Sequence, residues 1–294
     1  MGKKFEILSR LLDTTFTSQL IDHFRVKELH RQLSILLNRI KPDLINVHNL
    51  HSADWPISLV NTCLKTAPVF WTLHDCWSFL GSYYPSNTPP PSQKLKKKIN
   101  HFWESIKENP TTNKLSAVTP SKWMKQQAEK SFWGNHEVVS ISNPVPDSYF
   151  VLKDRMACKR VLNLHEKKTI VLCVAGNLNE ERKGGKFIKN ILESNWSSDI
   201  QFLLLGGNTS HLNTSENIIN LGFIKDEITI QMAYNAADLV VHPAPIDNLP
   251  NTVAESLSCG TPVLAFDTGG LAEMVIHQKN GWLVPSGDQA EMID

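Results

Sequence analysis

The sequence has few cysteines and no long apolar run, and each shortage excludes a class of protein. The five cysteines lie far apart among the 294 residues and form no CxxC pair, so neither a zinc site nor a disulfide framework is predicted. No apolar run reaches the roughly 20 residues needed to cross a bilayer. The start, Met1 to Arg10, lacks the apolar core and cleavage site of a signal peptide. These absences predict a protein of the reducing cytoplasm.

The sequence also has little excess of charge of either sign. Its 30 basic and 29 acidic residues give a net charge of +1, so no overall field favours nucleic acid as a partner. Hydrophobic residues make up 41% and charged residues 20%, which is typical of a globular protein. The length suits two α/β domains of ordinary size.

Short apolar runs alternate with helix-like stretches in the first half of the chain. A helix is predicted for Val26–Ile40, where leucines recur along one stripe. Strands are predicted at Asp43–Val47, Pro68–Leu73, Leu115–Val118 and Glu137–Ile141. Further helices are predicted at Ala53–Lys65 and Ser121–Lys130. This alternation is typical of a parallel sheet with crossover helices.

The same rhythm resumes after a polar joint at 147–168. Strands are predicted at Thr169–Ala175, Gln201–Leu205, Asn217–Leu221, Leu239–His242 and Pro262–Phe266. Helices are predicted at Gly185–Glu193, Ile228–Ala236, Asn251–Ser258 and Gly270–Ile276. The fold class is therefore α/β, with two Rossmann-like domains at 1–146 and 147–294. In such sheets ligands bind beyond the carboxyl ends of the strands.

A lysine-rich segment departs from this pattern. Ser82–Lys98 is predicted to be an exposed loop that leads into a helix carrying Phe102 and Trp103, and its basic residues are Lys94, Lys96, Lys97 and Lys98. One interpretation is an ordinary solvated surface. The other is peripheral contact with anionic phospholipid headgroups, which lysines beside aromatic side chains can make.

The run DNLPNTVAESLSCG, from Asp247 to Gly260, carries the most chemistry. It opens a helix after Pro250, and the first turn of a helix offers unpaired N–H groups and a dipole that favours anions. A diphosphate can therefore dock there without a metal, on the backbone of Leu249, Asn251, Thr252 and Val253. Asp247 and Glu255 are eight positions apart, so they can contact different parts of one elongated ligand. On spacing alone, the alternative interpretation is that Asp247 is a turn residue and Glu255 is an acid on the surface of the helix.

Together with the following TPVLAFDTGGLAEMV, this run resembles the signature of family 4 retaining glycosyltransferases, which have the GT-B fold. That family usually shows Glu, seven residues, Glu, and then Cys-Gly-Thr-Pro-Val. The resemblance implies that Glu255 holds the nucleotide ribose and that Asp247 contacts hydroxyls of the donor sugar. Asp stands where the family usually has Glu, so this contact is expected to be lost, to pass through water, or to suit a different sugar.

A second cluster, GNLNEERKGG from Gly176 to Gly185, carries two cations. Lys183 followed by Gly184 resembles the family's Lys-Gly that meets the diphosphate. Arg182 is a second candidate, because the Arg that often follows Gly176 in the family is absent here. Fixed cations at this point would stabilise the charge that grows on the leaving diphosphate. The alternative is that both are exposed loop charges.

A third cluster, WTLHDCWSFLG from Trp71 to Gly81, lies in the first domain. It resembles the branch of the family that builds bacterial surface polysaccharides, although Leu80 replaces the usual Thr. The resemblance implies that His74 lies beside the donor sugar. His48 and Asn49 match the same branch and are expected to line the acceptor side. Taken alone, a His after a buried strand is more often structural.

The resemblance extends from about Pro42 to the end of the chain. No opening strand with a Gly-rich loop is found, and the closing helices of the family are missing, so a chain truncated at both ends with an exposed sheet edge is predicted. The expected reaction moves a sugar with retention from a nucleotide-diphosphate donor to a glycan or lipid-linked acceptor, without cofactor or metal. Its catalytic residues would be His74, Asp247, Arg182 and Lys183, and Glu255, Gly176, Gly184 and the 249–253 turn would bind the donor.

Three alternatives stay open at this point. The chain could be a non-catalytic remnant that at most binds nucleotide, because the Gly-rich segment is missing. It could be a nucleotide-sugar epimerase, since such enzymes share the two-domain architecture. It could also be a membrane-bound scaffold that uses the lysines of 94–98.

Overall fold

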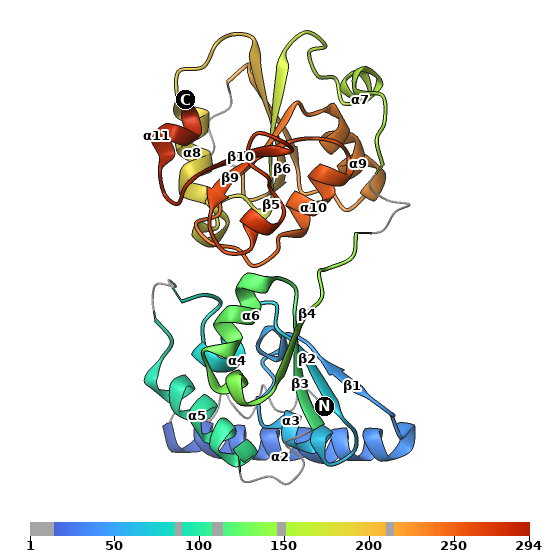
Figure 1. Ribbon diagram of the computed structural model, residues 1–294, viewed down its shortest axis with the longest axis vertical. Coiled ribbons are helices and arrows are strands. Elements are labelled where there is room, and N and C mark those ends of the chain that lie inside the picture. The colour runs from blue at the N-terminus through green and yellow to red at the C-terminus, as the bar shows by residue number, and fades with distance from the viewer. Residues whose placement is uncertain (1–14, 86–89, 108–113, 146–150, 210–214) are drawn as a thin grey trace. The chain divides into compact units, whose positions relative to one another are not determined.

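The computed structural model describes residues 15–85, 90–107, 114–145, 151–209 and 215–294 (Figure 1). Backbone contacts divide the chain into two compact units. The first unit holds the described residues up to Thr119 together with Lys125–Ser140, and the second holds Pro120–Met124 and Ile141–Asp294. Each unit contains one parallel sheet.

The sheet of the first unit has four strands in the order β1-β2-β3-β4. Their bounds are β1 Ile45–Val47, β2 Val69–Thr72, β3 Leu115–Thr119 and β4 Glu137–Ser140. All three pairings are parallel, so a crossover returns the chain to the same end of the sheet before each new strand begins. The strand predictions for this half are confirmed to within two residues.

The helices of the first half differ more from prediction. Their bounds are α2 Thr15–Ile40, η1 Leu50–Ala53, α3 Leu59–Leu64, α4 Trp77–Leu80, α5 Gln93–Lys107, α6 Lys122–Glu129 and η3 Phe132–Asn135. The helix predicted for Ala53–Lys65 was wrong in its first part, because Asp54 takes a left-handed conformation and Pro56 cannot supply a helical N–H. Helix α5 begins at Gln93, so the lysines of 94–98 lie on its first turns and not in a loop.

An aromatic core fixes the loop that follows β2. Trp71, Trp103 and Trp133 are almost fully buried, and the ring centroid of Trp133 lies 5.8 Å from that of Trp71 and 4.8 Å from that of Trp103. The indole N–H of Trp103 donates to the carbonyl of Ser78 at 2.9 Å, and that of Trp133 donates to the Ser78 hydroxyl at 3.0 Å. Both bonds hold the segment just after His74 against the core.

The sheet of the second unit has six parallel strands in the order β10-β9-β8-β5-β6-β7. Their bounds are β5 Thr169–Asn177, β6 Ile200–Gly207, β7 Ile218–Gly222, β8 Leu239–His242, β9 Val263–Asp267 and β10 Gly281–Pro285. The chain leaves β5 toward β7 on one side and then returns to β8 on the other. This reversal between β5 and β8 is a topological switch point, where doubly wound sheets bind ligands.

Helices cover both faces of this second sheet. Their bounds are α7 Arg155–Val161, η4 Glu181–Lys183, α8 Gly185–Glu193, α9 Glu227–Ala236, α10 Asn251–Ser258, η5 Leu271–Glu273 and α11 Gln289–Ile293. One buried cluster joins the sheet to α7, α9 and α10, and the other joins it to α8 and α11 (Figure 1). Apolar side chains on both faces explain why these strands read as continuous apolar runs.

Two predictions for this half were wrong. Gly270–Ile276 was predicted to be a helix, but only η5 forms there. Gly269 has a φ of 59°, and a Cβ at Gly269 or Gly270 would collide with the carbonyl oxygens of Asp247 and Asn248. The two glycines therefore serve close backbone packing and not helix formation. Helix α7 lies inside the stretch 147–168 that was predicted to be a polar joint, and Asp154 caps it by accepting from the N–H of Ala157 at 2.6 Å.

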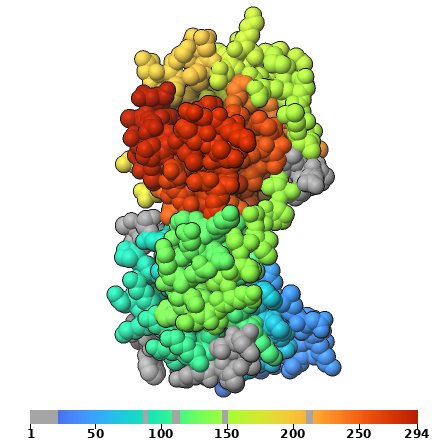
Figure 2. Space-filling view, viewed as in Figure 1, coloured from blue at the N-terminus to red at the C-terminus, as the bar shows by residue number. Residues whose placement is uncertain are grey.

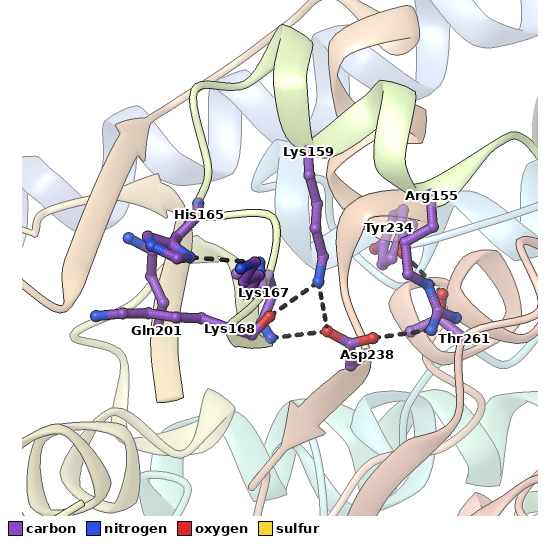
Figure 3. A network of polar contacts seen from close by, with 10 residues as sticks. Arg155, Lys159, His165, Lys167, Lys168, Gln201, Tyr234, Asp238 and Thr261 are labelled. Carbon is purple, nitrogen blue, oxygen red and sulfur yellow. Dashed lines mark hydrogen bonds and ion pairs between the residues drawn. The ribbon is translucent and has the colours of Figure 1, made fainter. Parts of the chain in front are cut away.

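A polar network attaches α7 to the amino-terminal edge of the second sheet (Figure 3). The ammonium of Lys159 lies 3.0 Å from Asp238 Oδ2 and 2.9 Å from the carbonyl of Lys168. The same Oδ2 accepts the N–H of Ile170 at 2.9 Å, and Arg155 reaches Oδ1 at 2.8 Å. The ammonium of buried Lys159 thus donates to two oxygens, one of them a carboxylate oxygen, and a buried cation needs such partners.

Among the described helices, none combines the length and apolar character that crossing a bilayer demands.

Candidate functional site

The carboxyl ends of β5 and β8 carry two of the three clusters that the sequence singled out. Strand β5 leads into the 176–185 segment, and β8 leads to Asp247 and then to α10. Figure 2 shows residues from the last part of the chain, in orange to red, gathered on one face of the second unit. The strand order therefore places both clusters at the switch point.

Lys183 and Asp247 meet in a direct ion pair. Lys183 Nζ lies 2.7 Å from Asp247 Oδ2 although 64 positions separate the two residues. The short helix η4 carries Lys183, and Gly184 ends it with a φ of 84°. A Cβ at Gly184 would collide with the carbonyl oxygen of Pro243, so only glycine allows the turn to approach the chain after β8 so closely.

Asp247 is buried and surrounded by groups that favour its ionised form. Its Oδ1 accepts the N–H of Asn248 at 2.9 Å. The Nε2 of His242, which is itself buried, lies 3.6 Å from Oδ2, beyond ordinary hydrogen-bond length. Burial opposes ionisation of Asp247, but His242 and Lys183 outweigh it and hold the pKa of this carboxyl well below its usual range.

His242 is a residue of the site that the sequence did not identify. It ends β8, and its Nδ1 lies 3.4 Å from the hydroxyl of Thr252 in the first turn of α10. His242 therefore lies between the loop acid Asp247 and the helix start. The only signal in the sequence was a polar residue at the end of the apolar run LVVH.

The start of α10 lies where the sequence placed it. Asn251 is exposed, Thr252 is half-buried and Val253 is buried, while Leu249 in the preceding turn is half-buried. The N–H of Val253 donates to the carbonyl of Pro250 at 3.1 Å, so this amide of the predicted anion cradle already has an acceptor within the chain.

Glu255 lies one turn into α10 and contacts a second residue that the sequence did not identify. The hydroxyl of Tyr234 in α9 donates to Glu255 Oε2 at 2.8 Å. Burial raises the pKa of Glu255, and the hydrogen bond from Tyr234 opposes that rise. Glu255 and Asp247 thus have pKa values shifted in opposite directions.

The remaining predicted donor-site residues are more exposed. Arg182 pairs with Glu180 at 2.8 Å. Gly176 is the penultimate residue of β5 and is exposed, and a Cβ there would meet nothing within 4 Å. Backbone geometry thus demands glycine at 184 but not at 176.

His74 lies in the first unit, just beyond β2. Its Nε2 is hydrogen-bonded to Nδ1 of His48 at 2.9 Å, and the two rings stack. Burial lowers the pKa of His74, and His48 lowers it further. Nearby, His51 Nε2 lies 3.2 Å from Asp75 Oδ2, and both residues line a small hollow together with Asn49. His48, Asn49 and His74 were identified from the sequence, but His51 was missed.

Comparison with known proteins gives a family match for the second unit. Residues 169–294 match the model of the family described as glycosyl transferases group 1. The uncharacterized glycosyltransferase MJ1607 of Methanocaldococcus jannaschii is 23% identical over 282 residues, which cover 89% of this chain and 67% of that protein. A D-inositol 3-phosphate glycosyltransferase of Jonesia denitrificans is 40% identical over 60 residues, 20% of this chain and 14% of the relative. The matched part of the chain thus spans about two thirds of the length of the first relative and 14% of the length of the second.

Solved structures share the arrangement of two parallel sheets. Sucrose-phosphate synthase from Thermosynechococcus elongatus has a TM-score of 0.73 at 18% identity and covers 91% of this chain and 67% of its own. Anabaena HepE in complex with UDP has a TM-score of 0.64 at 18% identity, covering 91% and 70%. These neighbours establish the predicted α/β fold with two parallel sheets, the GT-B-like architecture.

Residues 169–294 thus match the family of group 1 glycosyl transferases, and the solved neighbours show the GT-B-like fold.

Proposed function

We propose that this protein is a retaining glycosyltransferase of family 4 that takes a sugar from a nucleotide diphosphate. The observation that carries the proposal is the Lys183–Asp247 pair at 2.7 Å, at the switch point and directly before α10. A cation fixed beside a helix start is suited to a diphosphate. HepE, a structural neighbour, forms complexes with UDP and with UDP-glucose, which supports a nucleotide-sugar donor here.

In the proposed reaction the bond between the anomeric carbon and the diphosphate oxygen breaks. Negative charge then grows on the diphosphate, where Lys183, Arg182 and the backbone N–H groups of Leu249, Asn251 and Thr252 stabilise it. Gly176 and Gly184 let the diphosphate approach the backbone. The acceptor hydroxyl attacks the anomeric carbon from the face that the diphosphate leaves, so the configuration is retained, and its proton passes to an oxygen of the departing diphosphate.

The two acids and His74 have separate proposed roles. Glu255 binds the ribose of the donor, and Asp247 contacts hydroxyls of the transferred sugar while it pairs with Lys183. We assign His74, in the acceptor-side domain 1–146, to the donor sugar, and we take 147–294 as the donor-binding domain. This division supports a reaction in which each domain holds one substrate.

The proposed acceptor is a glycan or lipid-linked sugar in the synthesis of a surface polysaccharide, made in the cytoplasm. The resemblance of Trp71–Gly81 to the polysaccharide-building branch supports it, and a structural neighbour is the lipopolysaccharide outer core galactosyltransferase WaaB. Transfer of radiolabelled sugar to lipid extracts, followed by NMR of the product anomer, tests both points. Product with inverted configuration would contradict retention, whereas epimerised donor without an acceptor would indicate the epimerase alternative.

The basic face of α5 supports peripheral binding to an anionic membrane. Its four exposed lysines, at 94 and 96–98, lie opposite a buried apolar side, to which Phe102 and Trp103 belong. These aromatic residues are buried, so the proposed contact is electrostatic and does not involve their insertion. Changing the four lysines to Ser should abolish flotation with vesicles that contain 30 mol % anionic lipid. Equal flotation of both proteins at low salt would contradict this contact.

A further inference from the structure

Tyr234 is a buried tyrosine whose hydroxyl has a specific acidic partner. The residue is 0% exposed and lies in α9, which packs against α10. Its hydroxyl donates to Glu255 Oε2 at 2.8 Å. A buried hydroxyl without an acceptor is costly, and a charged acceptor makes the bond stronger than a neutral one. The contact therefore fixes one oxygen of Glu255 from the inside of the unit.

The tyrosine is itself held in place through its backbone. The hydroxyl of Thr261 donates to the carbonyl of Tyr234 at 2.7 Å, and the hydroxyl of Ser256 donates to the carbonyl of Thr261 at 2.8 Å. Thr261 and Ser256 are both almost fully buried. The Tyr234 hydroxyl is thus presented to Glu255 from a packed position and not from a loop.

Fixing Oε2 limits the rotamers of an otherwise flexible glutamate. The side chain then presents its second oxygen, Oε1, in a defined direction, and a ligand that binds to it need not order the side chain. The hydrogen bond also favours the ionised carboxylate, because it opposes the rise in pKa that burial causes. The titratable neighbours of this carboxylate are Tyr234 from α9 and Cys259 beyond α10, whose pKa values are both raised.

We propose that Tyr234 is a positioning residue that orients Glu255 toward the ribose hydroxyls of the donor, and so makes the site prefer ribonucleotides. This inference rests on the donor-binding function proposed above. An ionised carboxylate accepts hydrogen bonds from both hydroxyls of a vicinal diol, whereas a dideoxyribose offers neither. The ribose preference should therefore depend on the geometry that the Tyr234 hydroxyl imposes.

The test compares paired nucleotides in a Tyr234→Phe variant. UDP, GDP and ADP are titrated into the protein by calorimetry, and the tightest is compared with its 2′,3′-dideoxy counterpart. The wild type should bind the ribonucleotide about tenfold more tightly or better. In Y234F this ratio should fall to about threefold or less, while the affinity for the dideoxy compound stays unchanged. A purely structural role would lower both affinities equally and leave the ratio as it was, which would overturn the proposal.

Three further variants keep the test decisive. In Glu255→Gln and in the double variant E255Q/Y234F the ratio should be equally low, because no carboxylate is left to orient. Thr261→Val removes the hydroxyl that holds the Tyr234 backbone, and it should lower the ratio less than Y234F does; it replaces Y234F if that variant does not fold. If no nucleoside diphosphate binds the folded wild type, the donor-binding function fails, and that outcome is distinct from an unchanged ratio.

Discussion

Strand β8 has a lysine–aspartate pair beyond each end, and the two pairs differ in use. At its amino end, Asp238 binds Lys159 and also accepts a backbone N–H and Arg155. At its carboxyl end, Asp247 binds Lys183. The side chain of Lys159 is 5% exposed and that of Lys183 is 28% exposed. The amino-end pair is enclosed by protein, whereas the carboxyl-end pair leaves its cation accessible beside a helix start.

The difference shows that an ion pair alone does not indicate a site. What separates the two pairs is the end of the strand at which each lies and the access that its cation has. Parallel sheets bind ligands beyond their carboxyl ends. The Asp238 pair therefore serves to hold α7, and the Asp247 pair is the candidate for ligand chemistry.

Replacing Asp238 should have the largest effect on stability, and this effect should distinguish the roles of the two ion pairs. Asp238→Ala leaves the buried ammonium of Lys159 without its carboxylate, so the free energy of unfolding should fall by about 3 kcal/mol. Urea denaturation measures this loss, and nucleotide affinity should stay the same. Arg155→Ala is the matched control, because Arg155 is 43% exposed and should cost at most about 0.5 kcal/mol. Loss of nucleotide binding in a folded D238A protein would contradict the conclusion that the Asp238 pair serves stability alone.

Lys183→Met should act mainly on binding. Asp247 would keep His242 and the N–H of Asn248, so stability should fall by only about 1 kcal/mol. Affinity for a nucleoside diphosphate should fall at least about tenfold, or about 1.4 kcal/mol. Lys189→Met is the control, since Lys189 is half-exposed and lies 3.8 Å from Glu193 on the same helix. Equal affinities of K183M and K189M would assign Lys183 to stability alone.

Glu255→Gln should have the smallest effect on stability, and of the opposite sign. The pKa of Glu255 is raised in the folded protein, so folding favours its protonated form. The stabilisation is complete below the pKa of an unfolded glutamate, about 4.3, and is lost as the pH rises through the folded pKa. Glutamine cannot ionise and still accepts from Tyr234. E255Q should therefore be more stable than the wild type at pH 7.5, by up to about 1 kcal/mol, and equal to it near pH 4.

Urea midpoints at the two pH values check this sign. An E255Q protein that is less stable at pH 7.5 would show that the ionised carboxylate stabilises the fold. Glu255 would then stabilise the fold, as Asp238 does. It would not be a residue that binds a ligand at a cost in stability.

Much of the fold could be predicted from local patterns. The apolar runs gave all the strands named for the second unit, and the helices Gly185–Glu193 and Asn251–Ser258 have the predicted bounds. The errors arose where tertiary packing decides. Gly269 and Gly270 pack against the carbonyls of Asp247 and Asn248, and no local pattern shows that contact. Helix α7 was missed because it is only seven residues long and gives too short a pattern.

The site could be predicted only as far as its motif extends along the chain. Glu255 and Asp247 stand out by spacing and resemblance, but their partners Tyr234 and His242 belong to α9 and to the last position of β8. Those contacts come from helix and strand packing, and single residues of these types have many structural uses. The pairing of Lys183 with Asp247 spans 64 positions and needs the turn at Gly184.

Calorimetric titration of UDP, GDP and ADP into the wild-type protein, with and without a chelator, tests the central claim most directly. We expect saturable binding of at least one nucleotide with an affinity in the micromolar range, about 8 kcal/mol, that the chelator does not change. The absence of binding by all three to a well-folded preparation would contradict a diphosphate site formed by Lys183 and the start of α10.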